Sequence, residues 1–149
     1  RTLTADIRQR VAKTEERLEG ITQPLRVFLF DMDDRTPYTA GSLGPQQLLL
    51  SLARAENIFA DLQTRMAGVS WEAVLERNPE VIILVDSVWS SADHKRRLLR
   101  TNPALCSLKA VRKNRLITLK FPDMMPGIRF GEAVEKLARQ LYPERFSTE

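Results

Sequence analysis

The sequence predicts an α/β fold, with a mostly parallel sheet of about four strands and helices on both faces. The first observation behind this prediction is residues 81–85, Val-Ile-Ile-Leu-Val, an apolar run without polar alternation. Such a run is typical of a strand that is buried on both faces of a parallel sheet. The second observation is that strand-like and helix-like segments alternate along the chain, which favours helices on both sides of the sheet.

Composition limits the chain to one ordinary domain and excludes several functions. Its 149 residues, 43% of them hydrophobic, are enough for a single core. The single Cys106 excludes a disulfide within the chain, and the single His94 excludes a histidine-rich metal site. No apolar run reaches the roughly 20 residues that cross a bilayer. The net charge of +4 is dispersed and the aromatic residues are few, which argues against nucleic acid as a partner.

The first segment predicts one long amphipathic helix over residues 2–21, which Gly20 and Pro24 end. Its apolar residues recur at helical spacings with charged residues between them: Leu3, Ile7, Val11, Leu18 and Ile21. Such a helix either packs on its own sheet or forms a spine towards a neighbouring domain. The chain begins at Arg1, without a methionine and inside this helix, so we expect that an upstream part has been removed.

The next segments predict two strands and a helix. Residues 25–30 form a second apolar run, and the acidic residues 31–34 cannot lie in a core, so the chain leaves the sheet there. Residues 38–40 predict a short strand. Residues 41–44 begin and end with glycine and predict a turn, after which residues 46–55 predict a helix.

The second half of the chain repeats this alternation around the central strand. Ser70 predicts the N-cap of a short helix, which Pro79 ends before the central strand. Asp93 predicts the cap of a basic helix that runs to residue 101. Residues 116–119 predict another strand, and residues 130–141 predict an amphipathic helix that closes the domain.

Two loops at strand ends are the first candidates for a binding site. In open parallel sheets ligands gather beyond the carboxyl ends of the strands. Residues 86–89, Asp-Ser-Val-Trp, follow the central strand directly. Residues 121–127 follow the last strand and contain two prolines and two methionines, which predicts an irregular loop of the kind that often holds ligands.

One stretch indicates an enzyme as an alternative. Residues 27–36 resemble the opening motif of haloacid-dehalogenase-type phosphatases. In that family the first aspartate attacks phosphorus and the second handles the proton beside magnesium, so the resemblance implies these roles for Asp31 and Asp33. Asp34 and Arg35 stand where that motif usually has glycine and threonine.

A longer resemblance begins at the central segment. Residues 70–83 resemble the S-x-E…P-D-V-I segment of periplasmic substrate-binding proteins that serve ABC importers of ferric siderophores, haem and cobalamin. Residues 39–61, 110–116 and 126–143 resemble further segments of that family in the same order. Arg54 and Asn114 replace usual glycines, and Glu80 replaces a usual aspartate: these departures lie at turns.

The resemblance implies a two-lobed, non-enzymatic binding protein of which this chain is one part. It implies that residues 1–22 are the spine helix between the lobes and that residues 23–149 are the carboxyl-terminal, three-layer Rossmann-like lobe. It also implies a ligand cleft between the lobes and makes Glu72 the carboxylate that docks on the importer permease. The implied location is the periplasm, or the outer face of a single-membrane bacterium through an upstream lipid anchor.

The expected ligand is a metal chelate, first a ferric siderophore and alternatively haem or cobalamin, with no resident cofactor or metal. We predict six ligand-binding residues at the strand ends: Arg35, Tyr38, Ser87, Trp89, Met124 and Arg129. The two arginines and residues 95–97, Lys-Arg-Arg, would pair with an anionic siderophore, and the two aromatic rings would face its rings. Because a lone lobe leaves its spine uncovered, we expect self-association through residues 2–21.

Overall fold

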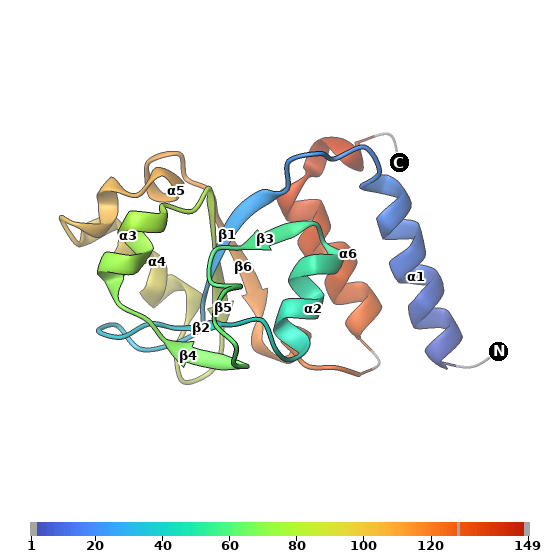
Figure 1. Cartoon of the computed structure of the whole chain (residues 1–149), viewed down its shortest axis with the longest axis horizontal. Helices are drawn as coiled ribbons and strands as arrows, with labels where there is room; N and C mark the ends of the chain where they lie inside the picture. The colour runs from blue at the N-terminus through green and yellow to red at the C-terminus, as the bar shows by residue number, and fades with distance from the viewer. Residues whose placement is uncertain (1–2, 128, 148–149) are drawn as a thin grey trace.

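The computed structural model describes residues 3–127 and 129–147, and it is built around a four-stranded parallel sheet. The strands are β1 (Leu25–Phe30), β3 (Ala55–Asn57), β5 (Val81–Asp86) and β6 (Leu116–Lys120), in the order β3-β1-β5-β6. Helices cover both faces of this sheet, as Figure 1 shows, so the predicted α/β class is confirmed.

Six α-helices and three short 3₁₀ turns connect the strands in the described part of the chain. The helices are α1 (Leu3–Arg17), α2 (Pro45–Leu52), α3 (Trp71–Arg77), α4 (Ala92–Thr101), α5 (Lys109–Arg112) and α6 (Phe130–Leu141). The 3₁₀ turns are η1 (Leu105–Ser107), η2 (Phe121–Met124) and η3 (Pro143–Arg145). A two-stranded antiparallel ribbon, β2 (Tyr38–Ala40) with β4 (Met66–Gly68), lies beside the main sheet.

The two faces of β1 and β5 supply two separate cores, because successive side chains of a strand point to opposite faces. Phe28 and Ile82 pack with α3, α4 and α5 on one face. Val27 and Ile83 pack with α2 and α6 on the other. These side chains are fully buried, which is why the sequence of β5 lacks polar alternation.

Helix α1 packs on α6 and lies outside the three layers (Figure 1). A Cβ atom at Gly131 would lie 3.2 Å from the carbonyl oxygen of Ile7, so the two helices approach closely there. Glu135 accepts from the Arg10 Nε at 3.0 Å and thereby links the helices. The helix ends at Arg17, earlier than the predicted end at residue 21, and residue 2 lies outside the described residues.

One predicted helix end is a strand. Residues 46–55 were expected to be helical, but α2 ends at Leu52 and Arg54 has a left-handed φ of 59°. The chain then turns into β3, which pairs with β1. The Asn57 Nδ2 donates to the carbonyl of Ala40 at 2.8 Å and fixes β3 beside the ribbon. Long-range pairing therefore overrides the helical pattern at the end of this segment.

The caps of α3 and α4 give one confirmed and one corrected prediction. The Ser70 Oγ accepts from the amide of Ala73 at 3.1 Å, as expected of the α3 N-cap. Helix α4 is capped by Ser91, whose Oγ accepts from the amide of His94 at 3.1 Å. The prediction that Asp93 is this cap is wrong, because Asp93 lies inside the first turn.

Candidate functional site

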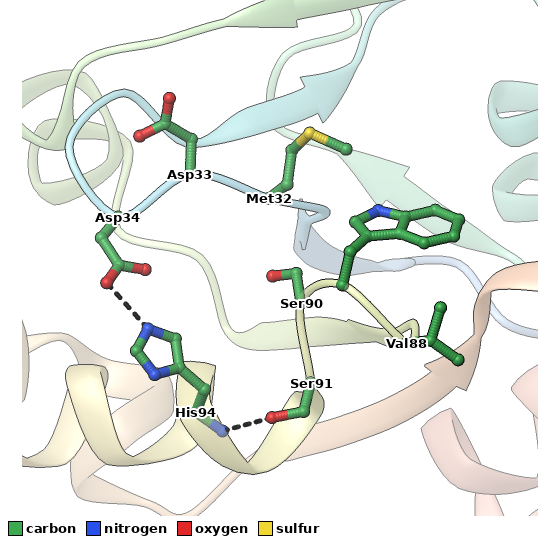
Figure 2. A pocket seen from close by; sticks show the side chains of 8 residues that line it. Met32, Asp33, Asp34, Val88, Ser90, Ser91 and His94 are labelled. Atoms are coloured by element: carbon green, nitrogen blue, oxygen red, sulfur yellow. Dashed lines mark hydrogen bonds and ion pairs between the residues drawn. The ribbon is translucent and has the colours of Figure 1, made fainter.

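The carboxyl ends of β1, β5 and β6 meet at one edge of the sheet, the lower edge in Figure 1. A hollow of about 600 Å³ lies at this edge between the loop after β1 and the loop after β5. Its lining residues come from these two loops and from the start of α4: Met32, Asp33, Asp34, Val88, Trp89, Ser90, Ser91 and His94. Figure 2 shows Asp33 and Asp34 on one side of the hollow, opposite Ser91 and His94.

The loop after β1 is held in place by hydrogen bonds of its own. The Asp33 Oδ1 accepts from the amide of Arg35 at 3.0 Å and from that of Thr36 at 3.3 Å. Asp33 has a left-handed φ of 72°, which aspartate tolerates better than most residues. The indole Nε1 of Trp71 donates to the carbonyl of Asp34 at 2.6 Å, so this loop is also tied to helix α3.

A side-chain contact closes one end of the hollow. The His94 Nε2 lies 2.8 Å from the Asp34 Oδ2, and both side chains are about half exposed. This contact joins the loop after β1 to α4, which are far apart in the sequence (Figure 2). It also fixes the position of one of the two carboxylates that line the hollow.

Lys95 is a buried residue that contacts Ser90, one of the residues that line the hollow. Its side chain is fully buried, and the Nζ donates to the Ser90 carbonyl at 2.8 Å and to the Ser90 Oγ at 2.6 Å. Burial lowers the pKa of Lys95, while the nearby charge of Asp31 raises it. Burial raises the pKa of the Asp31 carboxyl, and Lys95 lowers it. The two groups therefore compensate part of each other's cost of burial.

A second hollow of about 290 Å³ lies on the same edge, towards β6. It shares Val88 and Trp89 with the first and is completed by the ends of β5 and β6: Asp86, Ser87, Lys120, Phe121 and Pro122. The Trp89 ring packs against the Phe121 ring at a centroid distance of 5.2 Å and an angle of 71°. Trp89 nevertheless remains 60% exposed, so it is available at the edge.

Of the six predicted ligand residues, the structure places Ser87 and Trp89 in the hollows. Arg35 and Tyr38 lie on the loop and ribbon after β1 at the same edge, but they line neither hollow. Arg129 begins α6, and its Nη2 lies 3.4 Å from the Oδ1 of Asp123. Four of the six predicted residues, Arg35, Tyr38, Ser87 and Trp89, therefore lie at one edge, and the two aromatic ones are exposed there.

Two expectations about individual side chains do not fit the structure. Met124 is only 1% exposed and packs in the core, because the loop after β6 folds into a 3₁₀ turn that directs it inward. Met125 is the exposed residue of this pair, at 44%. Lys95 was expected to pair with an anionic ligand, but its Nζ is engaged by Ser90.

The sequence reasoning missed the contact between Asp34 and His94. No local pattern links these two residues, because the fold alone brings them together. The available signal was the acidic run of residues 31–34 just after a predicted strand, and this run indicates only that the chain leaves the sheet there. Across the described ranges, no group of three or more His, Cys, Asp or Glu side chains could hold a metal ion.

Most of the exposed large apolar side chains lie at this same edge. In the described part of the chain they are Tyr38, Leu43, Leu48, Val88, Trp89 and Met125. Tyr38, Val88, Trp89 and Met125 lie on the segments that follow β1, β5 and β6, whereas Leu43 precedes α2 and Leu48 lies within it. Exposed apolar groups of this kind mark surfaces that contact a ligand or another protein.

A comparison with protein families identifies the class of protein to which this chain belongs. The model of the periplasmic binding protein family matches residues 1–122. The chain belongs to this family. Its members are periplasmic solute-binding proteins, which are not enzymes, and nothing in the comparisons supports the phosphatase alternative. Asp31, the nucleophile of that alternative, is also only 6% exposed.

Individual relatives agree with the family assignment. The chain is 31% identical over 122 residues to the uncharacterized ABC transporter substrate-binding lipoprotein YvrC of Bacillus subtilis, covering 80% of this chain and 36% of that protein. A periplasmic binding protein of Veillonella parvula superposes with a TM-score of 0.84 and 30% identity, covering 95% of this chain and 49% of that one. An ABC-type Fe³⁺-hydroxamate transport system of Saccharomonospora viridis gives a TM-score of 0.74 and 25% identity, covering 93% and 47%.

The chain therefore spans about a third to a half of the length of these relatives. Membership of this family places the chain on the outer side of the cytoplasmic membrane. The relative YvrC is a lipoprotein. In the structurally described residues, no helix has the length and apolar character needed to span a membrane.

Proposed function

We propose that this chain is the carboxyl-terminal lobe, with part of the interlobe helix, of an extracytoplasmic binding protein that delivers an iron chelate to an ABC importer. The observation that carries the proposal is the carboxyl edge of the sheet, where two hollows and most of the exposed large apolar side chains lie together. An edge of this kind suits a ligand cleft covered by a second lobe. Helix α1 supports the division at residue 22, because it packs outside the three layers.

The proposed cargo is a ferric siderophore, with haem or cobalamin as alternatives. The Fe³⁺-hydroxamate relative supports an iron chelate, since it matches nearly the whole of this chain at 25% identity. Trp89 offers an exposed ring face to such a chelate. Cargo is held between two lobes in this proposal, so the edge of this lobe supplies one wall of the site.

The proposed docking residue is Glu72, in the first turn of α3. Its side chain is exposed and lines neither hollow, so it is free to meet a cationic partner. The Ser70 cap fixes the start of this helix and thereby the direction of Glu72. An arginine of a permease would form a charge-assisted hydrogen bond with this carboxylate.

For a lone lobe, the proposal places self-association at the carboxyl edge rather than at residues 2–21, where it was expected. In α1, Val11 packs against the core, and Leu18, just after the helix, is fully buried. Most of the exposed large apolar side chains of the described chain lie at the carboxyl edge. A second copy would therefore contact the carboxyl edge more readily than α1.

The test separates ligand binding from docking. We expect the intact, two-lobed protein to bind a ferric siderophore with quenching of its tryptophan fluorescence. Glu72→Ala should keep that affinity and reduce uptake of the iron chelate by cells about tenfold, as expected for a lost charge-assisted bond. Glu76→Ala changes an exposed glutamate of the same helix and should affect neither.

Each part of the proposal has an outcome that contradicts it. Absence of chelate binding by the folded protein would exclude the binding function. Normal uptake with Glu72→Ala would exclude docking through this residue. Loss of chelate affinity in the same folded variant would place Glu72 in the ligand site instead.

A further inference from the structure

The side chains that line the larger hollow include two carboxylates, whereas an anionic ligand requires positively charged side chains. Its charged or titratable lining residues are Asp33, Asp34 and His94, and no lysine or arginine of the described chain lines it. Figure 2 shows the carboxylates of Asp33 and Asp34 on the same loop at the border of the hollow. A polyanion placed here would meet two carboxylates at short range.

The basic residues Lys95, Arg96 and Arg129 do not line this hollow. Lys95 is buried and donates to Ser90, and its charge acts on Asp31, Asp86 and Asp34. Arg96 contacts the Asp93 Oδ1 at 2.8 Å and the Thr118 Oγ1 at 3.3 Å. The Arg129 Nη2 lies 3.4 Å from the buried carboxylate of Asp123.

The negative charge of Asp33 is not neutralised by a neighbouring side chain. Its Oδ1 accepts from two backbone amides of its own loop, which stabilise the carboxylate without cancelling its charge. Across residues 3–127 and 129–147, no basic side chain lies within ion-pair distance of Asp33. The charged lining residues of the smaller hollow are Lys120 and Asp86, so that hollow adds no excess of positive charge.

The remaining lining is apolar and aromatic. Val88 is 97% exposed and Trp89 is 60% exposed, and both stand between the two hollows. The face of an indole ring attracts cations through its quadrupole. An exposed indole beside two carboxylates therefore favours an apolar ligand that carries a positive charge or none.

We propose that this edge selects neutral or cationic metal chelates and rejects polyanionic ones, with Asp33, Asp34 and Trp89 as the selecting residues. This inference rests on the proposed binding function and specifies its ligand class. Among ferric siderophores it favours trihydroxamates, in which three singly charged ligands balance Fe³⁺, over tris-catecholates, which retain three negative charges. It differs from the expectation that Arg35 and Arg129 pair with an anionic siderophore.

The test compares two ferric chelates of opposite charge by calorimetric titration of the protein. One is a ferric trihydroxamate with a cationic amine, and the other is a ferric tris-catecholate. We expect the cationic chelate to bind at least about tenfold more tightly, from the opposite signs of its interaction with the two carboxylates. The difference should shrink when salt is raised to about 0.5 M, because exposed charges are screened.

Variants identify the residues responsible. Asp33→Asn keeps the Oδ1 acceptor of the loop and should weaken the cationic chelate about threefold, with a gain for the anionic one. Trp89→Leu should weaken the cationic chelate by about as much, through loss of the ring face. Asp93→Asn removes an exposed carboxylate of α4 that lines neither hollow, and it should change neither affinity.

The outcomes separate this inference from the function beneath it. Tighter or equal binding of the tris-catecholate, or equal affinities of Asp33→Asn and the wild type, would overturn the charge selection and leave the binding function standing. Failure of the folded protein to bind either chelate would overturn both.

Discussion

The two edges of the sheet satisfy their polar groups in different ways. At the amino edge, the Tyr142 hydroxyl donates to the carbonyl of Arg54 at 2.6 Å and accepts from the amide of Leu25 at 2.8 Å. This one side chain therefore joins the beginnings of β1 and β3. The amide of Arg26 donates to the Glu80 Oε1 at 3.0 Å and joins β1 to the segment before β5.

The carboxyl edge has the opposite character. It exposes Val88 and Trp89, contains two hollows, and leaves the buried Asp31 Oδ1 without a hydrogen-bond partner in the described chain. Unsatisfied and exposed groups cost stability, and a structure retains them where a ligand or partner uses them. The amino edge therefore holds the sheet together, while the carboxyl edge is left open for binding.

A tyrosine-to-phenylalanine substitution at each of the two edges should give the largest difference in the free energy of unfolding. Tyr142→Phe removes the hydroxyl that bonds both Arg54 and Leu25, and we expect it to lower the free energy of unfolding by about 2 kcal/mol. Tyr38→Phe at the carboxyl edge should change it by less than about 0.5 kcal/mol, because Tyr38 is exposed. Denaturant unfolding of both variants measures the difference, and equal losses would contradict the distinction between the edges.

A smaller effect is expected from the buried carboxyl of Asp31. Burial raises its pKa above the ordinary 3.8, although Lys95 acts against this. The folded protein then holds this proton more tightly than the unfolded chain, so the contribution of Asp31 to stability is present below pH 3.8 and is lost as the pH rises through the folded-state pKa. The Asp31→Asn variant does not undergo this loss. Its free energy of unfolding should therefore increase relative to that of the wild type as the pH rises from 3.8 through the folded-state pKa of Asp31.

The control for this pH dependence is Asp93→Asn, which changes an exposed carboxylate on α4. Its unfolding free energy should follow that of the wild type through the same window. Parallel curves for Asp31→Asn and the wild type would show that burial does not raise the pKa of the Asp31 carboxyl.

The smallest effect should come from the surface link between α1 and α6. Burial raises the pKa of Glu135, but hydrogen bonds from Arg139 and Arg10 outweigh it and lower the pKa overall. Its stabilisation is therefore present above pH 4.5 and is lost as the pH falls through the folded-state pKa. Glu135→Gln should cost about 0.5 kcal/mol at neutral pH, and salt should reduce this cost.

Thermal unfolding at two salt concentrations measures this last effect. Glu15→Gln changes an exposed glutamate of α1 and is the matched control. A cost as large as that of Tyr142→Phe would mean that α1 contributes to the main core, and it would weaken the interpretation of α1 as a spine.

The fold could be predicted where apolar patterns are local and long. Residues 25–30, 81–85 and 116–119 became β1, β5 and β6 with bounds that differ by at most one residue. Residues 38–40 became β2, but β3 and β4, also of three residues each, were not predicted. The turn into β3 is made by Arg54 in a left-handed conformation. Arginine itself gives no signal for such a turn, and only the glycine that the resembling family has at this position indicated it.

The candidate site could be predicted as a place but not as a set of contacts. The carboxyl edge follows from the parallel topology, so Ser87 and Trp89 could be placed there from the sequence. The pairing of Asp34 with His94 depends on how two loops meet in space. The burial of Lys95 could not be predicted either, because it precedes two arginines that suggest a solvated basic face.

The order of strands also determines how this chain can fold. Central strand β5 pairs with β1 through Val81 and Val27 and with β6 through Ile82 and Leu116, all parallel pairings between segments far apart in the sequence. Such pairings form slowly, since long loops must close first. Until β6 pairs with it, β5 presents an unpaired strand that is apolar from Val81 to Val85, which is a template for aggregation. Addition of β6, late in the chain, is therefore the step that protects the nascent protein from its own central strand.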